Sequence, residues 1–249
     1  MNKRVILTAL LSVAFAVTWL LPTPPLAQAP PPSPANAEEA SVRPEYKPPA
    51  RGAPGGRVGG ASRGTVKATT PLPTIELLAP DQYAGQTTSP SPTLYFYVSQ
   101  PIAWPTKFTV SAPSRPDPVV EANIPAPQQA GVNAIRTADY RVRLQPGVLY
   151  TWSVSVILNP KAPSRDIVAS ASLLRTAPDA ELESALRAAT AGQRAALFAQ
   201  AGFWYDAVAA AADIEAFDRH AALDALINEV GLVEPAQYDR QTAGNSRSR

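Results

Sequence analysis

The sequence predicts an α+β protein, with an immunoglobulin-like antiparallel β-sandwich followed by a small C-terminal α-helical block, on a disordered N-terminal tether. Three observations carry this prediction. Prolines and glycines dominate residues 22–64, which offer almost no large apolar side chain for a core. Short β-branched and aromatic runs fill residues 73–177. From Pro178 onward the hydrophobic period changes from two residues to that of a helix.

The N-terminus has the pattern of a secretory signal. Lys3 and Arg4 precede an uncharged apolar run, 5–21, and Ala35-Asn36-Ala37 satisfies the small-x-small rule for cleavage. We therefore expect a signal peptide over 1–37 and a periplasmic or extracellular protein with no membrane span after cleavage. An uncleaved anchor is the alternative, because the run lies at the lower limit of length for a span.

Charge is distributed unevenly over the chain. The net charge of +2 becomes zero once Lys3 and Arg4 leave with the signal, and no cysteine is present to form a disulfide. The expected linker, 38–72, is basic, whereas the expected helical block, 178–234, holds ten carboxylates against three arginines. An exported chain without net charge does not favour nucleic-acid binding.

The glycine-rich stretch RGAPGGRVGGASRG spans residues 51–64. Its spacing of glycines resembles a phosphate loop, but Ala61 and Ser62 stand where a Walker motif needs lysine, and neither a strand nor a helix is predicted beside it. We interpret it as a tether. Arg51, Arg57 and Arg63 are candidate binding residues within it for an anionic polysaccharide or another acidic envelope component.

Turn residues divide the sandwich region at intervals of about ten residues, as in small β-sandwiches. The strands expected are 75–79, 94–99, 107–111, 119–123, 140–144, 149–158 and 166–175. Alternation is clearest at 149–156, where Tyr150, Trp152, Val154 and Val156 fall on one face, the expected centre of the core. The Leu144-to-Tyr150 spacing resembles the tyrosine corner of fibronectin type III domains, in which the hydroxyl bonds to nearby backbone.

Four helices are expected after the last strand. The first begins at Pro178 with acidic residues in its opening turns, and 193–201, 204–215 and 218–230 follow. Gly231 is expected to be the left-handed cap of the last helix. Residues 198–208 resemble the turn of a tetratricopeptide hairpin, in which a glycine ends one helix and an aromatic residue opens the next. The tail, 235–249, is expected to be disordered.

The aromatic run at 203–205 has two interpretations. Trp204 and Val208 lie one helical turn apart, which favours packing in a core. Exposed aromatics can instead bind sugar or peptide. We expect Tyr205 and Asp206 to be the most exposed pair, so Trp204, Tyr205 and Asp206 complete the candidate binding residues.

Little in the sequence points to catalysis or a cofactor. One histidine and no cysteine are present, no nucleophile elbow is found, and no carboxylate cluster has the spacing of a metal site. We therefore expect no cofactor and no metal. Paired carboxylates for glycan hydrolysis stay open, with Asp206, Asp139 and Glu121 as candidates, because their separation depends on the fold.

Several stretches together resemble a cyanobacterial domain-of-unknown-function family, number 928. They are 55–64, 87–89 with 92–98, 144–154, 164–170 and 198–207. The resemblance covers residues 51–236 and implies an exported protein without implying a reaction. We expect a non-catalytic binding or scaffolding module of the cell envelope, with an envelope protein as partner; carbohydrate binding or cell-wall glycan processing is the alternative.

Overall fold

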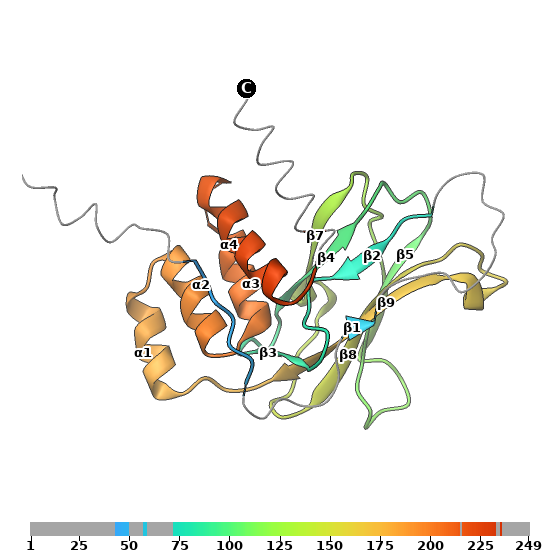
Figure 1. The fold of residues 1–249 in the computed structure, drawn as a ribbon. Helices are drawn as coiled ribbons and strands as arrows, with labels where there is room; N and C mark the ends of the chain where they lie inside the picture. Colours follow the sequence, from blue (N-terminus) through green and yellow to red (C-terminus); the bar gives the residue numbers. More distant parts are fainter. Residues whose placement is uncertain (1–42, 50–56, 59–71, 215, 233–234, 236–249) are drawn as a thin grey trace, which may run out of the picture. The chain divides into compact units, whose positions relative to one another are not determined.

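The longest strands, β8 (Leu149–Val156) and β9 (Ile167–Arg175), pair antiparallel in the middle of a six-stranded sheet. In the computed structural model, residues 43–49, 57–58, 72–214, 216–232 and 235 are described (Figure 1). The expected signal peptide and the tail beyond residue 235 lie outside these residues. All described residues belong to one unit, Ser41–Arg249.

The six-stranded sheet has the order β1-β9-β8-β5-β6, and β3 pairs parallel with β9. Its remaining strands are β1 (Arg57–Val58), β3 (Gly85–Thr87), β5 (Thr106–Ser111) and β6 (Val120–Ile124). A second sheet has the order β2-β4-β7, from β2 (Ile75–Leu77), β4 (Thr93–Val98) and β7 (Gly131–Arg136). Both sheets contribute to a single hydrophobic core.

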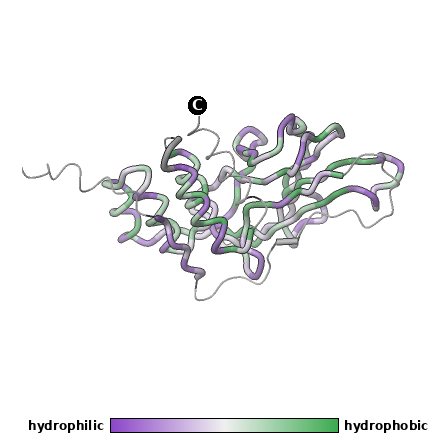
Figure 2. The backbone as a smooth tube through the Cα atoms, turned by 45° about the horizontal axis from the view of Figure 1, so that its top comes forward, coloured by the Kyte–Doolittle hydropathy of each residue, from purple (hydrophilic) through white to green (hydrophobic). Residues whose placement is uncertain are grey.

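The predicted inward face of 149–156 is confirmed. Trp152, Val154 and Val156 are fully buried, and Tyr150 is buried beside them. The Tyr150 hydroxyl accepts a hydrogen bond of 2.9 Å from the backbone N–H of Gln145, as expected of a tyrosine corner. Figure 2 shows hydrophobic (green) and hydrophilic (purple) stretches alternating along the chain.

The expected strand at 140–144 is wrong, for a physical reason. Val142 and Leu144 are buried, which produces the alternation seen in the sequence. Their N–H groups, however, bond to the carbonyl oxygens of Thr137 and Pro90 instead of to a neighbouring strand. Residues 137–140 form a short 3-10 helix, η2 (Thr137–Tyr140), and a second, η3 (Pro163–Arg165), precedes β9.

Within the described residues four α-helices follow β9, and side-chain caps mark where the first two of them begin. They are α1 (Ala180–Ala188), α2 (Ala191–Gln200), α3 (Trp204–Ala212) and α4 (Ala216–Glu229). The Asp179 carboxylate caps α1 by accepting from Leu182 N–H at 2.8 Å, so Pro178 precedes the helix. Thr190 and Gln193 form a capping box at the start of α2. Gly231, at φ +70°, follows α4 as predicted.

The turn between α2 and α3 is a Schellman motif. The N–H of Phe203 bonds to the carbonyl of Phe198 at 2.9 Å, and that of Gly202 bonds to Ala199 at 3.1 Å. Gly202 has φ +82°, a conformation that disfavours other residues. The rings of Phe203 and Phe198 meet edge to face at 6.5 Å, which is the hydrophobic contact typical of this motif.

Part of the segment 38–72, which is expected to be a disordered linker, is ordered. Residues 43–49 are extended along α2 and α3 (Figure 1), where Lys47 N–H bonds to the Ala199 carbonyl at 3.0 Å. Tyr46 is buried, with 7% of its surface exposed. Arg57 and Val58 pair with Ala171 and Ser170 as strand β1.

Candidate functional site

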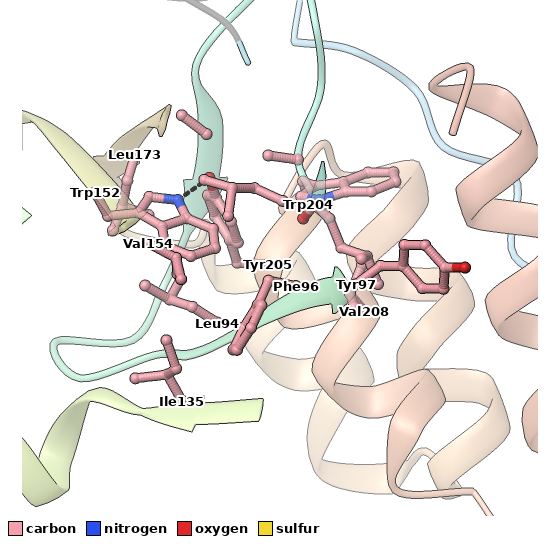
Figure 3. Packing of buried hydrophobic residues seen from close by; sticks show 14 of the residues in the cluster. Leu94, Phe96, Tyr97, Ile135, Trp152, Val154, Leu173, Trp204, Tyr205 and Val208 are labelled. Carbon is pink, nitrogen blue, oxygen red and sulfur yellow. Dashed lines mark hydrogen bonds between the residues drawn. The ribbon is translucent and has the colours of Figure 1, made fainter. Parts of the chain in front are cut away.

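The aromatic run at 203–205 belongs to the core. Trp204 is fully buried and Tyr205 is 1% exposed, so the expectation that Tyr205 is among the most exposed residues is wrong. Figure 3 shows both rings among buried side chains of the two sheets. Helix α3 is buried on more than one face, because it contacts both β3 and β4.

Hydrogen bonds attach α3 to both sheets. The Trp152 indole N–H donates to the Tyr205 hydroxyl at 2.8 Å, drawn as a dashed line in Figure 3, and that hydroxyl donates to the Ser172 carbonyl at 3.0 Å. The Trp204 indole N–H donates to the Leu78 carbonyl, just beyond β2, at 2.8 Å. Every polar atom of the two aromatic side chains therefore has a partner, as burial requires.

Gly85 lets β3 approach the Tyr205 ring. A Cβ atom at this position would lie 2.6 Å from Cε2 of Tyr205, far inside van der Waals contact. The close approach brings the end of β3 beside the first turn of α3. Thr88, the residue after β3, can therefore reach the carboxylate of Asp206.

Both carboxylate oxygens of Asp206 accept hydrogen bonds from Thr88. Thr88 donates through its N–H to Oδ2 and through its hydroxyl to Oδ1, each at 2.9 Å. Burial raises the pKa of Asp206 above the ordinary value of 3.8, while the hydrogen bonds from Thr88 and Thr87 act in the opposite direction. Asp206 is thus a partly buried anchor between α3 and the β3–β4 segment, and its expected exposure is not observed.

A pocket of about 390 Å³ lies between these same elements. Its lining comes from Ser89 and Ser91, from Arg194 and Phe198 of α2, and from Asp206 and Asp213. Arg194 and Asp213 are exposed, whereas Phe198 is half-buried against the core. The pocket thus combines an apolar wall with a cation, two carboxylates and several hydroxyl groups.

The segment behind the pocket is fixed by its own hydrogen bonds. The Ser91 hydroxyl donates to the Val142 carbonyl at 2.6 Å, and Ser91 N–H donates to the Ser89 hydroxyl at 3.1 Å. Arg175 at the end of β9 donates to the Leu144 carbonyl at 2.9 Å. The wall formed by 89–93 is therefore part of the rigid frame.

Only one of the three candidate arginines, Arg57, lies within the described residues. Arg51 and Arg63 lie outside the described residues. Arg57 lies in β1, opposite Ala171 of β9, at the edge of the six-stranded sheet. Their binding role stays a prediction.

The carboxylates considered for glycan hydrolysis come from separate elements. Glu121 lies on β6 and forms an exposed ion pair with Lys107 at 2.8 Å. Asp139 lies in the exposed part of η2, and Asp206 lies on α3. Among the residues that the structure describes, no group of three or more His, Cys, Asp or Glu could hold a metal ion.

A second pocket, of about 540 Å³, lies at the end of β5 and β6. Trp104, Asn123 and Gln128 line it together with small apolar residues. Trp104 is half-buried, while both amide side chains are exposed.

No helix within the described part of the chain is long and apolar enough to cross a membrane.

Several of these residues could not be identified from the sequence. Gly85, Thr88, Ser89 and Ser91 lie in a short polar stretch with no strand periodicity, although Thr88 and Ser89 belong to the resemblance noted above. Tyr46 carried a usable signal, because it is the sole aromatic residue within 22–64.

Comparison with known proteins identifies a family without an activity. No curated protein and no solved structure matches the chain. The family described as Domain of Unknown Function (DUF928) matches over residues 58–239, which include both sheets, all four helices and both pockets. The protein belongs to this family.

Proposed function

We propose that the protein is an exported, non-catalytic binding or scaffolding module of a cyanobacterial cell envelope. The observation that carries the proposal is the pocket between α2, α3 and residues 89–93. It presents Arg194 and Asp213 beside the ring of Phe198, a combination suited to a polypeptide, which carries both charges and apolar side chains. A protein of the envelope is the partner.

A binding role suits Asp206 better than an acid or base role. Its raised pKa in a pocket is a property shared with catalytic carboxylates. Both of its oxygens, however, are occupied by Thr88, whose hydroxyl and N–H orient them toward the frame. Asp206 therefore shapes the pocket wall, and the exposed groups make the contact.

Export is supported by the N-terminal sequence. Lys3, Arg4 and the apolar run 5–21 have the order of a secretory signal. The chain has no cysteine, so its fold does not depend on the redox state of its compartment.

We infer that the frame is an immunoglobulin-like sandwich. Lettered in chain order, β2-β4-β7 corresponds to A-B-E, and β9-β8-β5 corresponds to G-F-C, with β6 added beside C. Tyr150 has the position and bond of the tyrosine corner on strand F. Trp152 stands two residues later, where antibody domains carry a disulfide cysteine, and it fills the space between the sheets.

Capture from envelope extracts tests the proposed partner. Arg194→Glu reverses an exposed charge in the pocket, and Arg187→Glu makes the same change on exposed α1, away from it. We expect the wild type and Arg187→Glu to retain the same envelope protein and Arg194→Glu to lose it. Equal retention by all three proteins would rule out the pocket as the contact surface.

Carbohydrate binding is the second candidate, favoured by the pocket at Trp104. Aromatic rings stack on sugar faces, and the side-chain amides of Asn123 and Gln128 can bond to hydroxyl groups. Sedimentation with purified peptidoglycan or an acidic polysaccharide tests it. Binding that is lost in Trp104→Ala but kept in Arg194→Glu supports this candidate, and no sedimentation of the wild type excludes it.

A further inference from the structure

Residues 43–49, here called the strap, lie extended against α2, α3 and the end of α4, and the surface that they contact is here called the groove. Pro44 and Tyr46 are buried, whereas Glu45 and Lys47 between and after them are exposed. This alternation is that of an extended peptide lying on a surface. The strap precedes the residues matched by the family, 58–239, whereas the groove residues described below all lie within them.

Tyr46 is the anchor of the strap. Its ring meets Trp204 edge to face at 5.0 Å and stacks with Tyr83 at 6.1 Å. The Tyr46 hydroxyl donates to the Gly202 carbonyl at 3.4 Å. Burial is the main reason that the pKa of this hydroxyl is raised, so the side chain stays neutral. A buried aromatic side chain in a pocket is the usual centre of a peptide contact.

The strap backbone is also recognised. Tyr46 N–H donates to the carboxylate of Glu229 at the end of α4, and Lys47 N–H donates to the Ala199 carbonyl of α2 at 3.0 Å. Gly202 leaves room for the prolines that follow. A Cβ atom there would lie 3.1 Å from the Lys47 carbonyl oxygen and 3.3 Å from Cδ of Pro49.

We propose that this groove is a peptide-binding site for a partner segment with an extended tyrosine followed by prolines, and that the strap fills it in cis. The site is separate from the pocket at Arg194 and does not depend on it. Residues 50–56 join the strap to β1, and so short a connection keeps the local concentration of the strap high. A partner segment must therefore compete with the strap, which lowers its apparent affinity by the fraction of time that the groove is filled.

A labelled peptide with the sequence of residues 41–50 tests the proposal against the full-length chain. Tyr46→Ala removes the anchor of the strap and leaves the groove intact, whereas Glu45→Ala changes an exposed strap residue. We expect the peptide to bind Tyr46→Ala at least tenfold more tightly than the wild type or Glu45→Ala. A peptide carrying the Tyr46→Ala change should not bind. Equal binding to all three proteins, or binding to none, overturns the proposal.

A second variant decides the question if Tyr46→Ala does not fold. A protease site placed in residues 51–56 changes no contact that the structure describes and turns the strap into a separate ligand after cleavage. The cleaved N-terminal fragment should leave on dilution and rebind saturably when the peptide is added. Release without rebinding contradicts the proposal. Capture of an envelope protein through the pocket at Arg194 is a separate experiment. The proposed peptide site and the proposed envelope partner can therefore be refuted independently of each other.

Discussion

The backbone of Gly85 on β3 lies directly against the Tyr205 ring of α3. Because a Cβ at Gly85 would lie 2.6 Å from an aromatic ring that cannot bend away, Gly85→Ala should lower the free energy of unfolding by about 1–3 kcal/mol. Urea denaturation of Gly85→Ala, Tyr205→Leu and the double variant measures the coupling. The double variant should lose less free energy of unfolding than the sum of the losses in the two single variants. Additive losses would show that Gly85 and Tyr205 are not in contact.

Asp206 should make stability depend on pH. Its pKa in the folded protein is raised above 3.8, so in the interval between these values the folded chain binds more protons than the unfolded chain. Stability from this group is therefore fully present below pH 3.8 and is lost as the pH rises through the raised value. Asp206→Asn, whose amide can still meet Thr88, should remove that part of the pH profile.

Urea denaturation across a pH series measures this effect. Thr88→Val should raise the pKa of Asp206 further. The variant lacks the hydroxyl group whose hydrogen bond to the carboxylate lowers this pKa in the wild type. The loss of stability should then extend to higher pH than in the wild type. An unchanged profile in Asp206→Asn would show that this carboxylate does not titrate as described.

Sequence periodicity explains why Trp204 was placed correctly and Tyr205 was not. A helix that packs on one surface buries a single stripe, so Trp204 and Val208 were expected inward and their neighbours outward. Helix α3 instead contacts both β3 and β4, which buries Tyr205 as well. A second burying surface depends on the tertiary arrangement, which the pattern of one helix does not contain.

The α2–α3 turn is the element on which the strap and the aromatic run both depend. Gly202 has φ +82°, and Gly202→Ala should cost about 1–2 kcal/mol because a side chain is disfavoured in this conformation. Gly192 of α2 has nothing within 4 Å of an added Cβ, so Gly192→Ala should be neutral or stabilising by up to about 1 kcal/mol. Thermal or urea denaturation of both variants checks the pair. Equal losses of stability in the two variants would show that the positive φ of Gly202 does not require a glycine.

Helices were more predictable than strands at the level of elements. Caps are local in sequence, and Thr190 with Gln193 acts within one turn of α2. Strand pairing is not local. The buried alternation at Val142 and Leu144 resembled a strand but pairs with none, while β7 (Gly131–Arg136) begins with a glycine and alternates too weakly to be recognised.

At the scale of the whole molecule, the two sheets and the helices share one core. Residues of both sheets, of α2, α3 and α4, and of the strap belong to the same buried cluster. Buried residues before 72 and after 177 therefore pack in the same core as those of the two sheets. The candidate contact surface is formed only in this assembly, because its pocket takes one wall from 89–93 and the other from α2 and α3.

Function at this scale could be predicted only in outline. The sequence favours an exported protein, which stays a prediction, and the family match covers residues 58–239. The pocket could not be predicted, because Ser89 and Arg194 are brought together by pairing of β3 with β9 and by the packing of α3 on β3. Neither contact leaves a local pattern.

Site-specific photo-crosslinking in the envelope tests the central claim, that the pocket is the contact surface for a protein partner. A photoreactive residue at position 194 lies in the pocket, and one at position 187 on exposed α1 is the matched control. We expect one discrete adduct from position 194, of the same mass as the captured protein, and none from position 187. Equal adducts from both positions, or none from position 194 while capture persists, would contradict it.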